Sequence, residues 1–219
     1  MIEGTDGSGK SEQAKLLVSR LRRSGKKVAV FDFPQYKRQS SHFIREYLNG
    51  VYGTWRDVGP YQASLFYALD RFDAAPLIKK SLKEGIIVVA NRYVASNMAH
   101  QGAKMSRKER RKFFQWIYEL EYRTLGVPRP DLNVVLHVPS RIAQKLVDRK
   151  GKREYLGGAK RDIHEADLGH LKRAEAAYIE MAKTFPREFR LIECVRNGKL
   201  LSISEIGEGV WSVAKKITR

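Results

Sequence analysis

The chain alternates between short, continuously apolar runs and longer segments in which apolar residues recur every three or four positions. The runs at 85–90 and 132–138 are typical of strands buried on both faces of a sheet. Similar runs predict further strands at 27–32 and 189–195.

The segments between these strands have helical spacing. Helices are predicted up to Gly25, at 40–48, from Tyr61, from Ser106, at 163–183 and at 202–217. Pro76 should kink or restart the third of them, because proline lacks the helical N–H. Strands and helices alternate over the whole length with no linker. The sequence therefore predicts one α/β domain, residues 1–219, built on a parallel sheet covered on both faces.

Composition narrows the class of protein. The 219 residues are 42% hydrophobic, and 42 Lys and Arg against 24 Asp and Glu give a formal charge of +18. This charge favours anionic partners such as nucleotides, nucleic acid or membrane surfaces, without choosing among them. The single cysteine, Cys194, excludes an internal disulfide framework and a cysteine-rich zinc site. No apolar run approaches the roughly 20 residues of a spanning helix, and no signal-peptide pattern is present, so we expect a cytoplasmic protein.

The opening residues match a phosphate-binding loop, G-x-x-x-x-G-K-[ST], at every fixed position. Its glycines let successive N–H groups point at phosphate oxygens, at the start of a helix whose dipole favours anions. The residues predicted to bind a nucleotide here are Gly4, Asp6, Gly7, Ser8, Gly9, Lys10 and Ser11. Lys10 would reach the terminal phosphates as a catalytic cation, and the Ser11 hydroxyl would ligate Mg²⁺.

Only three residues precede this loop, although the pattern normally follows a strand. Either the first strand is very short, or the protein has residues before Met1. A short strand should anchor the loop weakly. A GTPase is not indicated, because the nearest string to the guanine-binding pattern N-K-x-D, Asn-Gly-Lys-Leu at 197–200, does not match it.

Four further segments follow the loop in order. They are Phe-Pro-Gln-Tyr at 33–36, Leu-Phe-Tyr-Ala-Leu-Asp-Arg at 65–71, Asn-Arg-Tyr-Val-Ala-Ser-Asn at 91–97 and Gly-Val-Pro-Arg-Pro-Asp at 126–131. Together with the loop they resemble the thymidylate kinase family of nucleoside monophosphate kinases over nearly the whole chain. The resemblance implies a three-layer P-loop NTPase fold, a five-stranded parallel sheet flanked by helices, and transfer of the ATP γ-phosphoryl group to dTMP with Mg²⁺. It also implies a homodimer, with no membrane or nucleic-acid partner expected.

The resemblance also implies roles for residues at the acceptor site. Asp6 would hold the sugar 3′-hydroxyl of dTMP, while Tyr67 would stack on thymine and Arg71 would donate to its O4. Arg92, also catalytic, and Tyr36 would hold the acceptor phosphate. The other implied substrate-binding residues are Ser96, Asn97 at the base edge, His100 and Glu165. His100 stands where the family often has an aromatic residue that crowds out a ribose 2′-hydroxyl, which weakens the expected discrimination against ribonucleotides.

A basic segment containing glycines, at about 149–162, resembles the mobile lid of the family. Members supply a catalytic arginine from the phosphate loop or from this lid. Gly7 follows Asp6 here, so the loop offers no arginine. Arg153 or Arg161 would then neutralise charge on the transferred phosphoryl group, and Arg149 would stack on the ATP adenine.

The resemblance places Asn91, with Ser11, at the metal site. Asn91 departs from the family pattern there, because the family has aspartate before Arg-Tyr and uses it to organise the Mg²⁺ water shell. A neutral amide cannot attract the ion as a carboxylate does. Either Asp6, Asp70 or Glu165 compensates, or Mg²⁺ affinity and rate are reduced. On this hypothesis Asn91→Asp raises the rate.

Three alternatives remain open at this point. The chain could be a kinase of another nucleoside monophosphate or of a deoxynucleoside. It could be a weakened nucleotide-binding protein, or a basic nucleic-acid-binding module that retains the fold.

Overall fold

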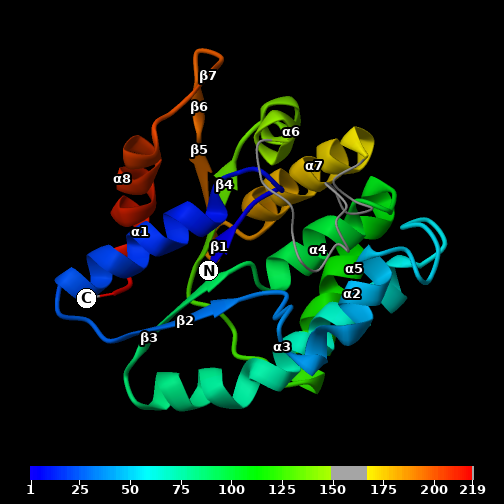
Figure 1. Ribbon diagram of the computed structural model, residues 1–219, viewed down its shortest axis with the longest axis horizontal. Helices are drawn as coiled ribbons and strands as arrows, with labels where there is room; N and C mark the ends of the chain where they lie inside the picture. The colour runs from blue at the N-terminus through cyan, green and yellow to red at the C-terminus, as the bar shows by residue number, and fades with distance from the viewer. Residues whose placement is uncertain (149–166, 219) are drawn as a thin grey trace.

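The computed structural model describes residues 1–148 and 167–218 and contains a five-stranded parallel sheet (Figure 1). The strands are β1 (Ile2–Glu3), β2 (Val28–Asp32), β3 (Ile87–Asn91), β4 (Asn133–His137) and β5 (Phe189–Glu193). Their order across the sheet is β2-β3-β1-β4-β5. The predicted five-stranded parallel sheet is confirmed.

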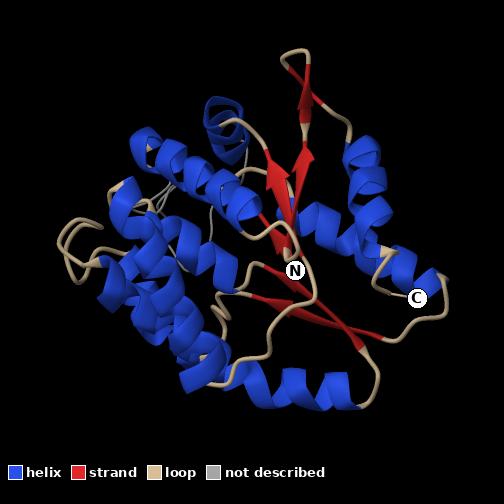
Figure 2. Ribbon diagram, turned by 180° about the vertical axis from the view of Figure 1, so that it is seen from behind, coloured by secondary structure: helices blue, strands red, loops and turns tan. Residues whose placement is uncertain are grey.

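Helices cover both faces of this sheet and complete the three layers (Figure 2). One face carries α1 (Lys10–Arg23) and α8 (Ile203–Ala214), whose apolar residues share a core cluster with Ile2 and Val134. The other face carries α3 (Pro60–Lys83), α4 (Val94–Gly102), α5 (Arg107–Tyr118) and α7 (Leu168–Thr184). Shorter helices are the 3₁₀ turn Gln39–Ser41, α2 (His42–Leu48) and α6 (Ser140–Asp148), and the π-helix Glu119–Thr124 continues α5. Within the described residues, no helix is long and apolar enough to cross a membrane.

Most predicted elements lie where the sequence placed them, with corrections at the boundaries. Helix α3 continues through Pro76 without restarting. The last strand of the sheet ends at Glu193, because Val195–Arg196 pairs instead with Lys199–Leu200 in an antiparallel hairpin, β6 and β7. Positive φ angles of 52° at Asn197 and 74° at Gly198 allow the tight turn between them. The helix predicted at 163–183 is described from Leu168 onward.

Strand β1 is very short yet occupies the centre of the sheet. Ile2 pairs with Asn91 of β3 on one side and with Val134 of β4 on the other. It is 1% exposed, so side-chain burial adds to pairing on both edges. The strand therefore holds the phosphate loop at the middle of the sheet despite its length.

His137 links four elements at the carboxyl ends of β4 and β5. Its Nδ1 lies 2.6 Å from Glu193 Oε2 of β5, and its Nε2 lies 2.9 Å from Glu175 Oε1 of α7. Glu175 in turn accepts the backbone N–H of Ser140 at the start of α6. The hydrogen bond to Glu175, with that to Glu193, outweighs desolvation and raises the pKa of His137 to about 9.

Stability should therefore depend on pH through His137. Because its pKa in the folded protein, about 9, exceeds the ordinary value of 6.5, the stabilisation is complete below about pH 6.5 and is lost toward pH 9. We expect the difference in unfolding free energy between the parent protein and His137→Gln, measured by urea denaturation, to shrink across this range. The control is His42→Gln, which alters an exposed histidine. A difference that stays constant with pH would contradict this role.

Candidate functional site

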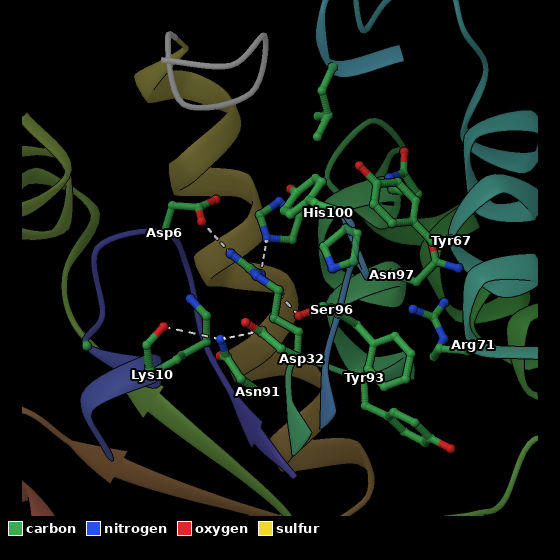
Figure 3. Close-up of a pocket in the computed structure, with 18 of the residues that line it drawn as sticks. Asp6, Lys10, Asp32, Tyr67, Arg71, Asn91, Tyr93, Ser96, Asn97 and His100 are labelled. Atoms are coloured by element: carbon green, nitrogen blue, oxygen red, sulfur yellow. Dashed lines mark hydrogen bonds and ion pairs between the residues drawn. The ribbon is translucent and has the colours of Figure 1, made fainter. Parts of the chain in front are cut away.

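A cavity of about 380 Å³ opens at the carboxyl ends of β1, β2 and β3 (Figure 3). Its walls come from the phosphate loop, the segment after β2, helix α3 and the segment from β3 into α4. The predicted residues that line it are Asp6, Gly9, Lys10, Ser11, Tyr36, Tyr67, Arg71, Asn91, Arg92, Ser96, Asn97 and His100. The structure thus brings together residues as far apart in the sequence as Asp6 and His100.

The phosphate loop requires glycine at particular positions. Gly7 has φ +83°, and a Cβ there would lie 2.1 Å from the carbonyl oxygen of Ala143. Gly9 also has a positive φ, +84°, but a Cβ there would meet nothing within 4 Å, so the loop faces open space at the start of α1. Among the described residues, no side chain caps α1, and Ser8 Oγ is buried without a hydrogen-bond partner. Unused donors around an open space suit an anion.

Arg92 is the centre of the polar wall. Its guanidinium pairs with Asp6 through Nη2, while Nη1 lies 3.1 Å from Ser96 Oγ and 3.2 Å from His100 Nε2. Burial acts to lower the pKa of Arg92, but Asp6 and other neighbours outweigh it and raise the pKa. Arg92 also has φ +63°, an unusual conformation for a residue with a side chain. The segment after β3 is held in this conformation with the cation turned into the cavity.

The environment of His100 keeps its ring neutral. Burial, with the positive charge of Arg92, holds the pKa of His100 well below its ordinary value. The ring stacks on His170 of α7 with centroids 5.7 Å apart, and His170 in turn contacts Trp55. His100 Nε2 therefore accepts from Arg92, and the imidazole forms an uncharged wall of the cavity.

Ser96 is tied to a buried carboxylate. Its Oγ donates to Glu3 Oε2 at 2.6 Å, and Tyr178 OH donates to the same oxygen at 3.1 Å. Glu3 is fully buried at the end of β1. Ser96 thereby joins the end of β1 to Arg92, a positioning contact that the sequence analysis did not foresee.

Arg71 and Asn97 share a partner that sequence analysis missed. Glu121, fully buried in the π-helix, accepts Arg71 Nη2 at 2.6 Å and Nε at 2.5 Å, and it accepts Asn97 Nδ2 at 3.0 Å. Asn97 Nδ2 also donates to Ser64 O at 3.1 Å. A signal was present in the sequence, because Glu121 follows Ile117 by four residues and so continues the apolar face of that helix.

Asn91 lies beside the carboxylate of Asp32, a residue for which the sequence predicts only a place at the end of a strand. Asn91 Nδ2 donates to Asp32 Oδ1 at 2.7 Å and to Ser11 Oγ at 3.2 Å. Asp32 is exposed at the sheet edge, yet the cleft walls desolvate it and raise its pKa, against the opposing effects of Asn91, Arg92 and Lys10.

Two acids that the sequence suggests as substitutes for an aspartate at position 91, Asp70 and Asp6, already have other partners. Asp70 accepts hydrogen bonds from Gln35 N–H at 2.8 Å and from Ser40 Oγ–H at 2.6 Å. The prediction that Asp70 serves as the carboxylate of the metal site is therefore wrong. Asp6 pairs with Arg92. No group of three or more His, Cys, Asp or Glu side chains that could hold a metal ion occurs in the described part of the chain.

The predicted lid residues Arg149, Arg153, Arg161 and Glu165 lie outside the described residues.

Comparison with known proteins agrees with this geometry. The thymidylate kinase family model matches residues 2–200. Thymidylate kinase from Mycobacterium tuberculosis is 32% identical over 182 residues, covering 83% of this chain and 84% of the relative. The human thymidylate kinase is 29% identical over 138 residues, 63% of this chain and 59% of the relative. The solved thymidylate kinase of Candida albicans has the same fold, with a TM-score of 0.73 at 20% identity, covering 98% of this chain and 89% of that one.

Glu121 should contribute strongly to stability, because its loss leaves the buried Arg71 guanidinium without a counter-charge. We expect Glu121→Gln to lower the free energy of unfolding by about 3–5 kcal/mol in chemical denaturation. The matched control is Glu119→Gln, two residues earlier in the same π-helix, where an exposed pair with Arg123 is removed. That change should cost less than about 0.5 kcal/mol. Equal effects of the two substitutions would rule out the buried ion pair as the cause.

Proposed function

The chain belongs to the thymidylate kinase family and transfers the γ-phosphoryl group of ATP to dTMP, and we propose how its residues divide this reaction. The observation that carries the assignment is the single cavity that joins the phosphate loop to the Tyr67, Arg71 and Asn97 wall, with Arg92 between them. One end suits the phosphates of ATP, the other suits a flat base, and the partly buried Arg92 lies where the acceptor phosphate would meet the donor.

The acceptor end would read thymine by stacking and hydrogen bonding. Tyr67 supplies a ring for the base, and Arg71 keeps Nη1 for thymine O4, since Nε and Nη2 bind Glu121. Asn97 Oδ1 is buried with no hydrogen-bond partner among the described residues, so it would accept the N3–H of thymine. The hydrogen bonds to Glu121 thus leave Arg71 Nη1 and Asn97 Oδ1 for the base.

The sugar and phosphate of dTMP would lie between the two ends of the cavity. Arg92 and Tyr36 would hold the acceptor phosphate, and Asp6 would accept the 3′-hydroxyl. Ser96 and His100 would act by holding Arg92 in place, since both contact its Nη1. His100 also forms the wall nearest the sugar in this arrangement.

The donor end would hold ATP through the loop amides and Lys10, whose Nζ is positioned by a 2.7 Å hydrogen bond to Thr5 O. A magnesium ion fits here, because a hydroxyl, Ser11, and a carboxylate, Asp32, lie on either side of the Asn91 amide. When bound, the ion would neutralise charge on the phosphate oxygens.

The reaction needs no general base. An oxygen of the dTMP phosphate is already largely anionic at pH 7, since the second phosphate pKa is about 6. It attacks the γ-phosphorus, a new P–O bond forms, and the bond to the ADP oxygen breaks. The residues hold two repelling anions in line and screen their charge.

Three further predictions from the sequence, on the lid, the domain organisation and the location, belong to this proposal. The lid at about 149–162 would supply Arg153 or Arg161 to the transferred group and Arg149 to adenine, with Glu165 near the substrate. The chain would act as one kinase domain. A cytoplasmic location also remains a prediction from the sequence.

The first test is ADP release in a coupled assay with Mg²⁺-ATP and separate acceptors. We expect the highest kcat/KM with dTMP, and lower values with dUMP, UMP, CMP, dGMP, AMP and thymidine. A different best acceptor would keep the kinase and overturn the proposed base recognition. No turnover with any acceptor, alongside ATP binding, would identify a weakened nucleotide-binding protein.

Variants of Tyr67 separate base recognition from general damage in the same assay. Tyr67→Ala should raise KM for dTMP by roughly 5- to 150-fold, the equivalent of about 1–3 kcal/mol of stacking, with KM for ATP unchanged. Tyr67→Phe keeps the ring and serves as the matched control. An equal loss in both variants would count against stacking.

The homodimer is proposed from an apolar stripe on α3. Tyr61, Leu65, Leu69 and Phe72 recur every three or four residues and are 41% to 49% exposed. A contiguous exposed apolar surface of this kind marks an interaction site, and a second copy of the same helix can cover it by two-fold symmetry.

Sedimentation velocity tests this surface directly. We expect the parent protein to sediment as a dimer and Phe72→Glu to sediment as a monomer, because the new charge would be buried without a partner. Ile217→Glu, which alters an exposed apolar residue away from α3, should stay dimeric. A monomeric parent, or a dimeric Phe72→Glu, would refute an interface on this stripe.

A further inference from the structure

We propose that Asp32, at the end of β2, supplies the carboxylate for the magnesium ion that accompanies ATP, with Asn91 as its positioning residue. This inference rests on the proposed function of the site. In the family pattern, one aspartate before Arg-Tyr serves the magnesium ion. Here Asp32 on β2 would supply the charge, and Asn91 on β3 would position it.

The register of the sheet brings the two residues together. β2 and β3 run parallel, and Asp32 and Asn91 form the last pair of the ladder between them. Their side chains meet at the cavity edge, where Asn91 Nδ2 lies 2.7 Å from Asp32 Oδ1 (Figure 3). The same nitrogen lies 3.2 Å from Ser11 Oγ of the phosphate loop. One amide thus holds the carboxylate on the same side of the site as the metal-binding hydroxyl.

The other acids of the cavity already have cationic partners. The acidic residues that line it are Asp6, Glu12 and Asp32. Asp6 pairs with Arg92, and Glu12 pairs with Lys15 at 3.0 Å. The hydrogen bond that Asp32 accepts comes instead from a neutral amide. Arg92 and Lys10 act on Asp32 only at longer range, and no salt bridge holds it among the described residues, so its charge can meet a cation directly. Mg²⁺ in phosphate sites is held by one or two carboxylates together with phosphate oxygens and water.

The orientation of Asn91 supports a positioning role. Its Nδ2 faces two oxygen atoms, whereas its Oδ1 is buried with no hydrogen-bond partner among the described residues. Aspartate at position 91 would place a second carboxylate against Asp32, where like charges repel. The neutral residue at 91 and the acid at 32 therefore complement each other, leaving one negative charge at the pair. The expectation that Asn91→Asp alone speeds the reaction assumed a site without this acid.

The test measures ATP binding, independently of turnover. ATP affinity is determined by titration calorimetry over a range of Mg²⁺ concentrations and in EDTA, for the parent protein and three variants. Asp32→Asn removes the charge, and Asp32→Asn combined with Asn91→Asp moves it to β3. Asp131→Asn makes the same chemical change at an exposed position just before the amino end of β4, whereas the cavity lies at the carboxyl ends of the strands.

We expect Asp32→Asn to weaken the apparent Mg²⁺ affinity in the presence of ATP by about 10- to 100-fold. ATP affinity in EDTA should be unchanged or slightly higher. The exchanged double variant should recover most of the Mg²⁺ affinity, and Asp131→Asn should match the parent protein. Recovery by the exchange would show that the charge itself, on either strand, serves the metal.

Two results would overturn the proposal. One is an Mg²⁺ affinity unchanged in Asp32→Asn. The other is an equal fall in ATP affinity with and without Mg²⁺, which would mark Asp32 as a structural residue. Failure of the proposed function is distinguishable, because then the parent protein itself would bind no ATP or would not phosphorylate dTMP.

Discussion

The site depends on the parallel arrangement of β1, β2 and β3, which makes all three strands end at one edge of the sheet. The phosphate loop follows β1, the Tyr36 segment follows β2, and Arg92 and α4 follow β3. Because parallel strands are joined through long crossovers, residues from distant parts of the chain converge there without any local contact in the sequence. β1 makes this possible with very few residues, since both of its neighbours hold it by hydrogen bonds.

Buried charges then give the cavity its shape. Arg71, which is buried, and Arg92, which is partly buried, lie in its wall, and each is paired with an acid from another part of the fold, Glu121 and Asp6 respectively. A charge removed from water is tolerated only when it is paired and hydrogen-bonded, so these guanidinium groups have few alternative positions. Ser96 accepts a hydrogen bond from Arg92, and Asn97 donates one to Glu121, so both ion pairs are restricted further. The binding surface is therefore organised before substrate arrives, which reduces the ordering that binding must impose.

The two ends of the cavity use different chemistry. At the proposed donor end, backbone amides and Lys10 would present positive potential to phosphates, while Asp32 would contribute one negative charge near Ser11. At the proposed acceptor end, neutral His100 and the ring of Tyr67 line a space that would suit a sugar and a base.

The sequence by itself determined whatever depends on neighbours along the chain. The apolar runs placed the buried strands, the glycine spacing identified the phosphate loop, and Ser106 with Glu109 located the start of α5. Family resemblance added the identity of the residues that line the cavity. Only the tertiary structure decided which distant groups face one another. Asp32 meets Asn91 through strand register across 59 positions, and Glu121 reaches Arg71 across 50. Such pairs depend on how helices and strands pack in three dimensions, and no local pattern in the sequence records that packing.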